Sequence, residues 1–230
     1  MKFSRTILPF CAAIVLTTGL VACSSDEVVK TDSKPSASES SPEPTETTEA
    51  ASGDFVSPAW ATPVTNPGDL LTTIEGTNFT VDIYQVGTDI ATKSGQFADP
   101  ETNEPILAVG DEIVYVNYVV TNTSDTDIPL SYNLVDVTAR YADWPYLQGM
   151  DSVVDRDLDA KMEINTSAIA PNTGEAPFIL AAGESFSFGE NFKYQAGSPI
   201  TFAATLTESD EAGDLNHDTR QEVEVESTIE

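Results

Sequence analysis

Basic residues are scarce in this chain. Ten lysines and arginines stand against 38 aspartates and glutamates over 230 residues, so the formal net charge is -28. Binding to a nucleic acid requires clustered cations that neutralise its phosphates, so this composition excludes a nucleic acid as a bulk partner. The hydrophobic content of 40% is nevertheless too high for a wholly disordered protein, and we therefore expect a packed core.

The sequence also lacks a hydrophobic run long enough to cross a membrane. The longest run, residues 7–16, falls short of the ~20 apolar residues that span a hydrocarbon core of ~30 Å. It follows Lys2 and Arg5, and a positive segment before a short apolar run is typical of an export signal. We expect residues 1–22 to be a signal peptide and the mature chain to have no transmembrane helix.

The predicted signal ends in Leu20-Val21-Ala22-Cys23, which resembles the lipobox of bacterial lipoproteins. In that family the cysteine thiol receives a diacylglycerol and the chain is cut before the cysteine. The resemblance therefore implies a palmitate-type anchor at Cys23 and a location on the extracellular face of the cell membrane. Two acyl chains hold a protein stably, because each buried CH₂ contributes about 0.8 kcal/mol. The alternative is a secreted protein in which Cys23 carries no lipid.

Cysteine and histidine are too few for most thiol and zinc chemistry. The two cysteines are Cys11, inside the predicted signal, and Cys23, so the folded part has no thiol for a disulfide, a zinc finger or a nucleophile. The one histidine, His217, lies in a polar stretch, and the chain has no Gly-X-Ser-X-Gly sequence. A solvated loop is therefore the default interpretation of His217, against a Ser-His-Asp triad.

Residues 23–53 change abruptly in composition and consist largely of Ser, Thr, Pro, Glu and Ala. Such a segment cannot bury enough apolar surface to offset its ordering entropy, so we expect a disordered tether. Its reach is about 30 Å as a flexible coil and could approach ~90 Å when stiffened by proline and charge. The tether would hold the folded domain away from the membrane.

Residues 54–230 alternate between apolar and polar residues almost throughout, which indicates β-strands. Segment 112–121 is apolar on both faces, so we expect it to be a central strand. Helix is limited to a turn or two, at 67–72 or at 151–161. The prediction is an all-β antiparallel sandwich of about 7–9 strands. The expected strands are 77–86, 112–121, 128–139, 178–180, 185–194, 200–206 and 222–229.

Two segments carry a family resemblance. Segment 109–124 ends in Asn122-Thr123-Ser124, and segment 180–188 contains the turn Gly183-Glu184. Together they resemble the immunoglobulin-like domains of many Gram-positive extracellular lipoproteins of unknown function, relatives of a secreted mycobacterial immunogenic sandwich protein. The resemblance covers about residues 75–207. It implies an immunoglobulin-like sandwich at the cell surface and no enzyme activity. The chain departs from the family between Tyr141 and Pro177, where a long insertion lies.

An aromatic cluster begins this insertion and is the candidate contact surface. Tyr141, Trp144 and Tyr146 follow a predicted strand instead of continuing its alternation. Such rings can stack on a glycan or anchor a protein partner. They can equally fill the end of the sandwich as part of the core.

Two acidic clusters have oxygen ligands of the kind that Ca²⁺ prefers. One contains Asp155, Asp157 and Asp159, preceded by Asp151, and the other has the same spacing. Neither has the glycine and the glutamate that an EF-hand requires at positions six and twelve. A weak extracellular Ca²⁺ site and a solvated acidic face are both open interpretations. The members of the second cluster are Asp214, Asn216 and Asp218.

The sequence thus predicts a membrane-anchored surface lipoprotein whose sandwich binds an unidentified protein or glycan, or serves the cell envelope, without catalysis or a cofactor. One alternative is a carboxylate-dependent hydrolase. A cleft with two acidic side chains about 5–9 Å apart, one of them buried, would favour it. The other alternative is a Ca²⁺-dependent adhesion module.

Overall fold

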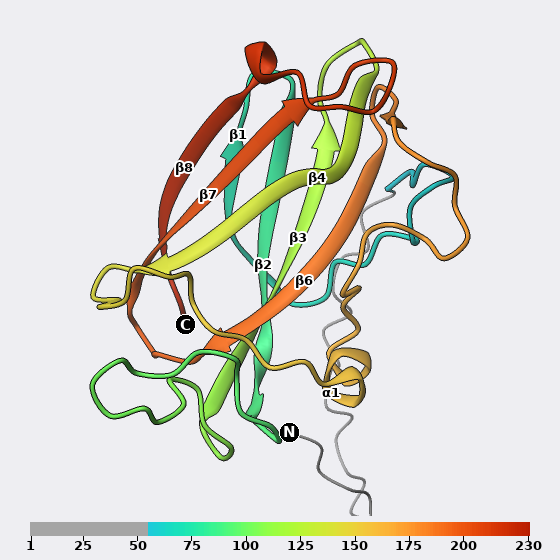
Figure 1. The fold of residues 1–230 in the computed structure, drawn as a ribbon. Helices are drawn as coiled ribbons and strands as arrows, with labels where there is room; N and C mark the ends of the chain where they lie inside the picture. Colours follow the sequence, from blue (N-terminus) through green and yellow to red (C-terminus); the bar gives the residue numbers. More distant parts are fainter. Residues whose placement is uncertain (1–54) are drawn as a thin grey trace, which may run out of the picture. The chain divides into compact units, whose positions relative to one another are not determined.

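The structure is a computed structural model that describes residues 55–230, which form two four-stranded antiparallel sheets (Figure 1). The expected all-β sandwich is confirmed. The signal peptide, the lipobox and the tether lie outside the described residues. The first sheet has the order β1-β2-β3-β6, with strands β1 (Asp69–Glu75), β2 (Phe79–Ile90), β3 (Glu112–Asn122) and β6 (Ser185–Lys193). The second has the order β5-β4-β7-β8, with strands β5 (Phe178–Leu180), β4 (Ile128–Tyr141), β7 (Pro199–Glu208) and β8 (Gln221–Thr228).

The strand order corresponds to the Greek key of immunoglobulin domains. Strands β2, β3 and β6 occupy the positions of strands A, B and E, and β4, β7 and β8 those of C, F and G. In the constant-type domain the strand that follows C is strand D, and it lies beside E. In this protein the strand that follows β4 is β5, and it lies beside β4. Because β5 is short, it pairs only with residues 128–130. The side of the sandwich between β6 and the rest of β4 therefore has no further strand.

Strand β3 is the centre of the core, as its two apolar faces predict. Residues 113–120 are all buried. Tyr118 and its even-numbered neighbours pack into the main core between the sheets, while Ile113 and Tyr115 pack on the opposite face against Val153 and Ile164. Because both faces of the first sheet are covered there, β3 has no solvent-facing side.

The expectation of a helical turn at 67–72 is wrong, and β1 begins there instead. Gly68 has a φ of +91°, which a right-handed helix does not allow. The following residues include Thr72, Thr73 and Ile74, whose β-branched side chains favour a strand, and they pair with β2. The other expected helix is confirmed as α1 (Arg156–Lys161), which begins where Asp155 accepts the backbone N–H groups of Asp157 and Leu158.

The alternation expected along β4 changes phase inside the strand. A β-bulge separates Leu130 from Val135, and Leu134 has a φ of 47°. From Leu130 to Val135 β4 advances by five residues while β7 advances by two, and an odd number of extra residues moves all later side chains to the other face. Tyr132, which the sequence places with Leu130 and Leu134, lies within this irregular stretch and is 60% exposed, whereas Leu134 and Val135 are both buried. Among the described residues no helix is long and apolar enough to span a membrane.

Candidate functional site

The insertion between β4 and β5, residues 142–177, runs along the open side of the sandwich and carries α1. Part of it is hydrogen-bonded to β6. The Gly189 N–H donates to the carbonyl oxygen of Asn165 over 2.8 Å. The Val153 N–H donates to Oδ1 of Asn191 over 2.8 Å, and Nδ2 of Asn191 donates back to the Val153 carbonyl over 2.9 Å. The insertion thus covers β6 but leaves an opening beside β4.

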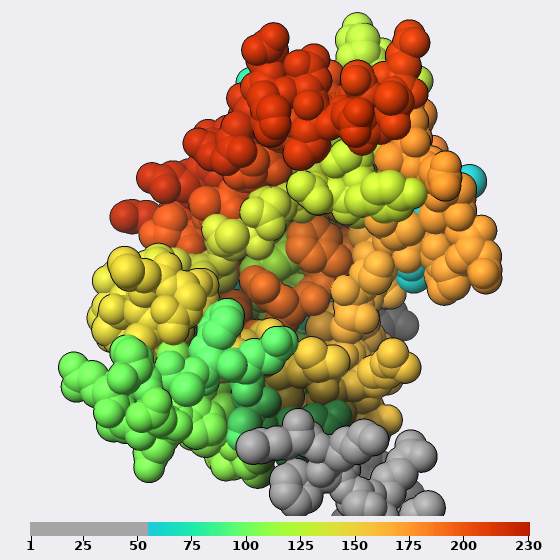
Figure 2. Space-filling model, in the orientation of Figure 1, coloured from blue at the N-terminus to red at the C-terminus, as the bar shows by residue number. Residues whose placement is uncertain are grey.

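This opening consists of two adjoining cavities of about 320 and about 270 Å³, which share Thr166 and Glu190. We call them together the Glu190 cleft. Figure 2 shows the hollow, with atoms of β6 recessed between the yellow-green β4 and the gold insertion. The residues that line the cleft include Val135, Asp136 and Val137 of β4, Arg156 and Asp159 of the insertion, and Phe188 and Glu190 of β6.

Glu190 lies where the alternation of β6 requires an inward-facing side chain. It shares its face with Phe186, Phe188 and Phe192 and is only partly exposed. The Tyr118 hydroxyl donates to Oε1 of Glu190 over 2.5 Å, and it is the only hydrogen-bond partner of this carboxyl group among residues 55–230. The second carboxyl oxygen therefore has no protein donor within the described part of the chain.

Burial raises the pKa of the Glu190 carboxyl group to about 7. The hydrogen bond from Tyr118 opposes this shift, and the negative charge of Asp136 adds to it. Desolvation disfavours the charged form of an acid, which is the physical reason for the direction. Burial and the Glu190 charge likewise raise the pKa of Tyr118 well above its ordinary value, so its hydroxyl stays a hydrogen-bond donor at neutral pH.

The floor of the cleft beside Glu190 is Phe188, which packs on further aromatic rings in the core. The ring of Tyr118 lies 5.2 Å from that of Phe188 and 6.2 Å from that of Phe202, measured between centroids. Phe188 stacks on Phe186 at 6.3 Å, and Trp60 contacts Phe186 at 5.5 Å. A floor of packed rings holds little water, which is why the carboxyl group of Glu190 is poorly solvated.

The cleft carries more negative than positive side chains. Asp159 is 6% exposed and makes no side-chain hydrogen bond within residues 55–230. Burial, and secondarily the charge of Asp155, raises the pKa of Asp159. Asp136 stands on the β4 wall, and the one cationic side chain lining either cavity is Arg156. Three acids against one guanidinium make the cleft suited to a ligand with a positive charge.

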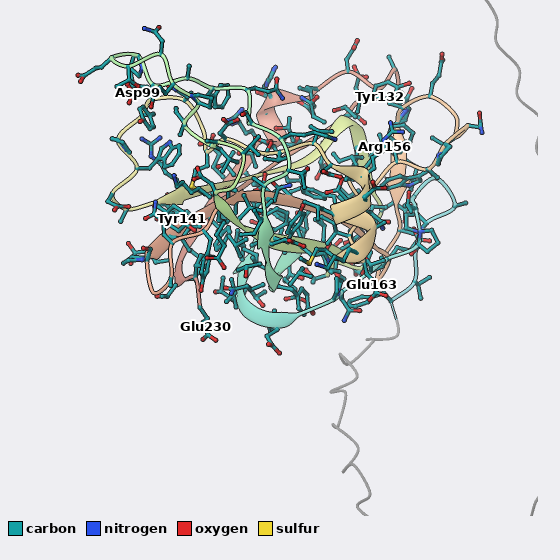
Figure 3. All side chains as sticks on the ribbon, turned by 90° about the horizontal axis from the view of Figure 1, so that it is seen from below. Asp99, Tyr132, Tyr141, Arg156, Glu163 and Glu230 are labelled. Atoms are coloured by element: carbon teal, nitrogen blue, oxygen red, sulfur yellow. The ribbon has the colours of Figure 1, made fainter. Side chains whose placement is uncertain are left out.

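The structure places the predicted contact aromatics at the end of the sandwich, away from the Glu190 cleft. Tyr141 is 1% exposed, and its hydroxyl donates to the Lys193 carbonyl over 3.0 Å. Trp144 is 8% exposed and contacts the partly exposed Tyr146 at 5.3 Å. The Tyr146 hydroxyl donates to Asp99 over 2.7 Å, and Figure 3 shows Tyr141 on the same side as Asp99 and far from Arg156. These rings pack within the domain, and a ligand contact by them stays a prediction.

The first acidic cluster is held by hydrogen bonds within the protein. Asp151 accepts the N–H groups of Gln96 and Phe97 over 2.8 and 3.0 Å. Asp155 accepts the Thr92 hydroxyl and begins α1, whereas Asp157 is exposed. These bonds fix the loop at 92–97 on the insertion. No group of three metal-ligating side chains is found among residues 55–230, and Ca²⁺ binding stays a prediction.

His217 begins a 3-10 turn (His217–Thr219) in the connection between β7 and β8, and it is exposed. It lines a cavity of about 400 Å³ together with Arg220, and this cavity shares Asp136 with the Glu190 cleft. Arg220 is paired with Glu222. In the second acidic cluster, Oδ1 of Asn216 accepts the Asp218 N–H over 3.3 Å and begins the turn.

The sequence prediction missed Glu190, although its pattern contained a signal. In Phe186-Ser187-Phe188-Gly189-Glu190-Asn191-Phe192 an acid takes one of four positions on an apolar face. A carboxyl group on the inward face of a strand is costly unless it is protonated or paired. That signal alone marks an unusual side chain, but it does not reveal the cleft.

No family model matches the chain, and no curated protein matches it. Among solved structures, similarity extends to ycdA, a candidate lipoprotein from Bacillus subtilis, with a TM-score of 0.36 and 13% identity over 70% of this chain and 39% of that one. This chain therefore spans well under half of that protein. A functionally unknown protein from Listeria monocytogenes has a TM-score of 0.35 and 9% identity, over 71% of this chain and 83% of that one. We draw no functional conclusion from similarities this distant.

Proposed function

We propose that this protein is a lipoprotein anchored on the extracellular face of the cell membrane, and that its β-sandwich binds a ligand with a cationic group in the Glu190 cleft, without catalysis. The proposal rests on one observation above all. The Glu190 carboxyl group lies on an aromatic floor, accepts one hydrogen bond from Tyr118 and lines both cavities. The membrane part rests on Leu20-Val21-Ala22-Cys23 and on the polar tether that follows.

A positive charge is the ligand property that best complements this site. An ionised carboxylate at a poorly solvated position is unfavourable until a cation or a second donor reaches it. The ring of Phe188, which lines the cleft, can also attract a cation through its π-electrons. A cation bound at Glu190 favours the ionised form, so binding is expected to lower the pKa of Glu190 and to strengthen as the pH rises through 7.

A carboxylate-dependent hydrolase is the second candidate. The raised pKa of Glu190 and the nearby charge of Asp136 favour it, because glycoside hydrolases pair a protonated acid with an ionised one. Binding remains the preferred function because Glu190 lies at the aromatic floor, whereas Asp136 is an exposed residue of the rim. Release of nitrophenol from nitrophenyl glycosides by the wild type, and not by Glu190→Gln, would replace our proposal with this one.

The binding proposal is tested with n-butylamine, which resembles the end of a lysine side chain. We expect amide NMR signals of residues 134–137 and 188–191 in the full-length protein to shift at pH 8 and to saturate in the millimolar range. The Glu190→Gln variant is expected to lose these shifts because it lacks the negative charge. Glu226→Gln, a change at an exposed position of β8, is the matched control and should keep them.

Neutral n-butanol separates charge recognition from simple filling of an apolar cavity. It has the same chain length and no charge, and it should shift the same signals only weakly. Equal shifts with butanol, or unchanged butylamine binding in Glu190→Gln, would contradict a cation site at Glu190.

A further inference from the structure

We propose that the ligand of the Glu190 cleft is an extended basic peptide, which adds to the free edge of β4 as a further strand and directs a lysine or arginine side chain toward Glu190. This inference rests on the proposed function and names the partner class of the same site. It is based on the backbone N–H and C=O groups of β4. These groups are independent of the sequence patterns and of the aromatic floor.

The edge of β4 beyond β5 has backbone groups without partners. The Ala142 N–H donates to the Pro199 carbonyl across the ladder with β7, so the even-numbered residues before it also bond toward β7. Val135, Val137 and Ala139 consequently direct their N–H and C=O groups to the opposite side. Within residues 55–230 these groups have no hydrogen-bond partner, since β5 pairs only with 128–130.

The edge of β6 that faces the same opening is covered, unlike that of β4. On β6 the Ser185 N–H donates to the Val56 carbonyl and the Gly189 N–H to the Asn165 carbonyl, each over 2.8 Å. At the other side of the second sheet, β8 lies near β1, and Gln221 accepts the Thr77 N–H over 2.9 Å. Uncovered sheet edges readily pair with another strand, and proteins normally protect them. The free part of β4 is also a wall of the cleft, because Val135 and Val137 line it.

Strand addition suits both the length of this edge and the charge beside it. Three outward residues at a repeat of ~6.8 Å provide about 14 Å of edge, enough for a peptide of about five residues. Main-chain hydrogen bonds would then supply affinity, and alternate side chains would enter the cleft. The acids there are Glu190, Asp159 and Asp136, so a basic side chain is the complementary one.

Charge argues against the two occupants that this protein could itself supply. A second copy brings the same net charge of -28. The segment before the described residues, at 23–53, is itself acidic. Either occupant would bring negative charge toward the three acids of the cleft, which is unfavourable at a partly desolvated site. A basic peptide from another protein brings the opposite charge.

The test uses three fluorescent nine-residue peptides of alternating threonine and valine and the full-length protein in detergent at pH 8. The first has a central lysine. The second is identical but N-methylated at alternate residues, which removes the strand hydrogen bonds, and the third has a central glutamate. We expect the lysine peptide to bind at least ten-fold more tightly than the other two. It should also slow amide hydrogen exchange at Val135, Val137 and Ala139.

The outcomes separate this inference from the function on which it rests. Equal binding of the N-methylated peptide, or unchanged exchange at the β4 edge, would overturn strand addition. Absence of peptide binding while n-butylamine still binds would overturn this inference alone. Failure of both probes would overturn the proposed function as well.

Discussion

Replacing Glu190 by glutamine is expected to stabilise the protein at pH 8 and to leave its stability nearly unchanged at pH 4. Burial raises the pKa of Glu190 from 4.5 to about 7, so the folded protein holds a proton that the unfolded chain releases. The proton on Glu190 therefore stabilises the folded state. This stabilisation is fully present below pH 4.5 and is lost as the pH rises through 7. Above pH 7, a pKa shift of this size lowers the free energy of unfolding by at most about 3 kcal/mol. Glutamine avoids this loss, and its amide oxygen can still accept the Tyr118 hydroxyl.

Urea unfolding at pH 4 and pH 8 measures this difference. The free energy of unfolding of Glu190→Gln should exceed that of the wild type by about 2–3 kcal/mol at pH 8. Glu226→Gln removes the same formal charge at an exposed position of β8, so it controls for the general effect of a lower negative charge. If Glu190→Gln destabilises the protein equally at both pH values, Glu190 acts only as a hydrogen-bond acceptor and the account of its ionisation is wrong.

Cys23→Ala is expected to move the protein completely out of the detergent phase in a Triton X-114 partition, or to leave its signal peptide uncleaved. The lipid is attached at this thiol in the proposal, and no other segment of the chain is predicted to enter the membrane. Cys11→Ala is the matched control, because it changes the other cysteine and leaves Leu20-Val21-Ala22-Cys23 intact. Cys11→Ala should remain in the detergent phase. A Cys23→Ala protein that is normally processed and still partitions into detergent would contradict the anchor.

The sequence predicted those strands whose alternation depends on local burial. In β8 the exposed positions Glu222, Glu224 and Glu226 alternate with the more buried Val223 and Val225, as expected. The sequence did not reveal β1, whose identity depends on pairing with β2. The phase change at Leu134 was also hidden, because a bulge forms between strands and leaves no mark in the alternation of one of them.

The candidate site was predictable only in part for a related reason. An acid at position 190 on an apolar face can be read from the sequence, but its environment depends on Tyr118 in a neighbouring strand and on Asp136 in the other sheet. The aromatic cluster shows the opposite case. Its rings looked like a contact surface because the partners that bury Tyr141 are remote in sequence: Phe192 contacts its ring at 5.7 Å and Lys193 accepts its hydroxyl.

The most direct measurement is an NMR titration of the Glu190 side-chain carboxyl carbon in the folded protein, assigned by comparison with Glu190→Gln. We expect a pKa close to 7 that falls when n-butylamine is added, because the bound cation favours the ionised carboxylate. A pKa near the ordinary value of 4.5, unchanged by the amine, would show a well-solvated glutamate and contradict the proposed binding site.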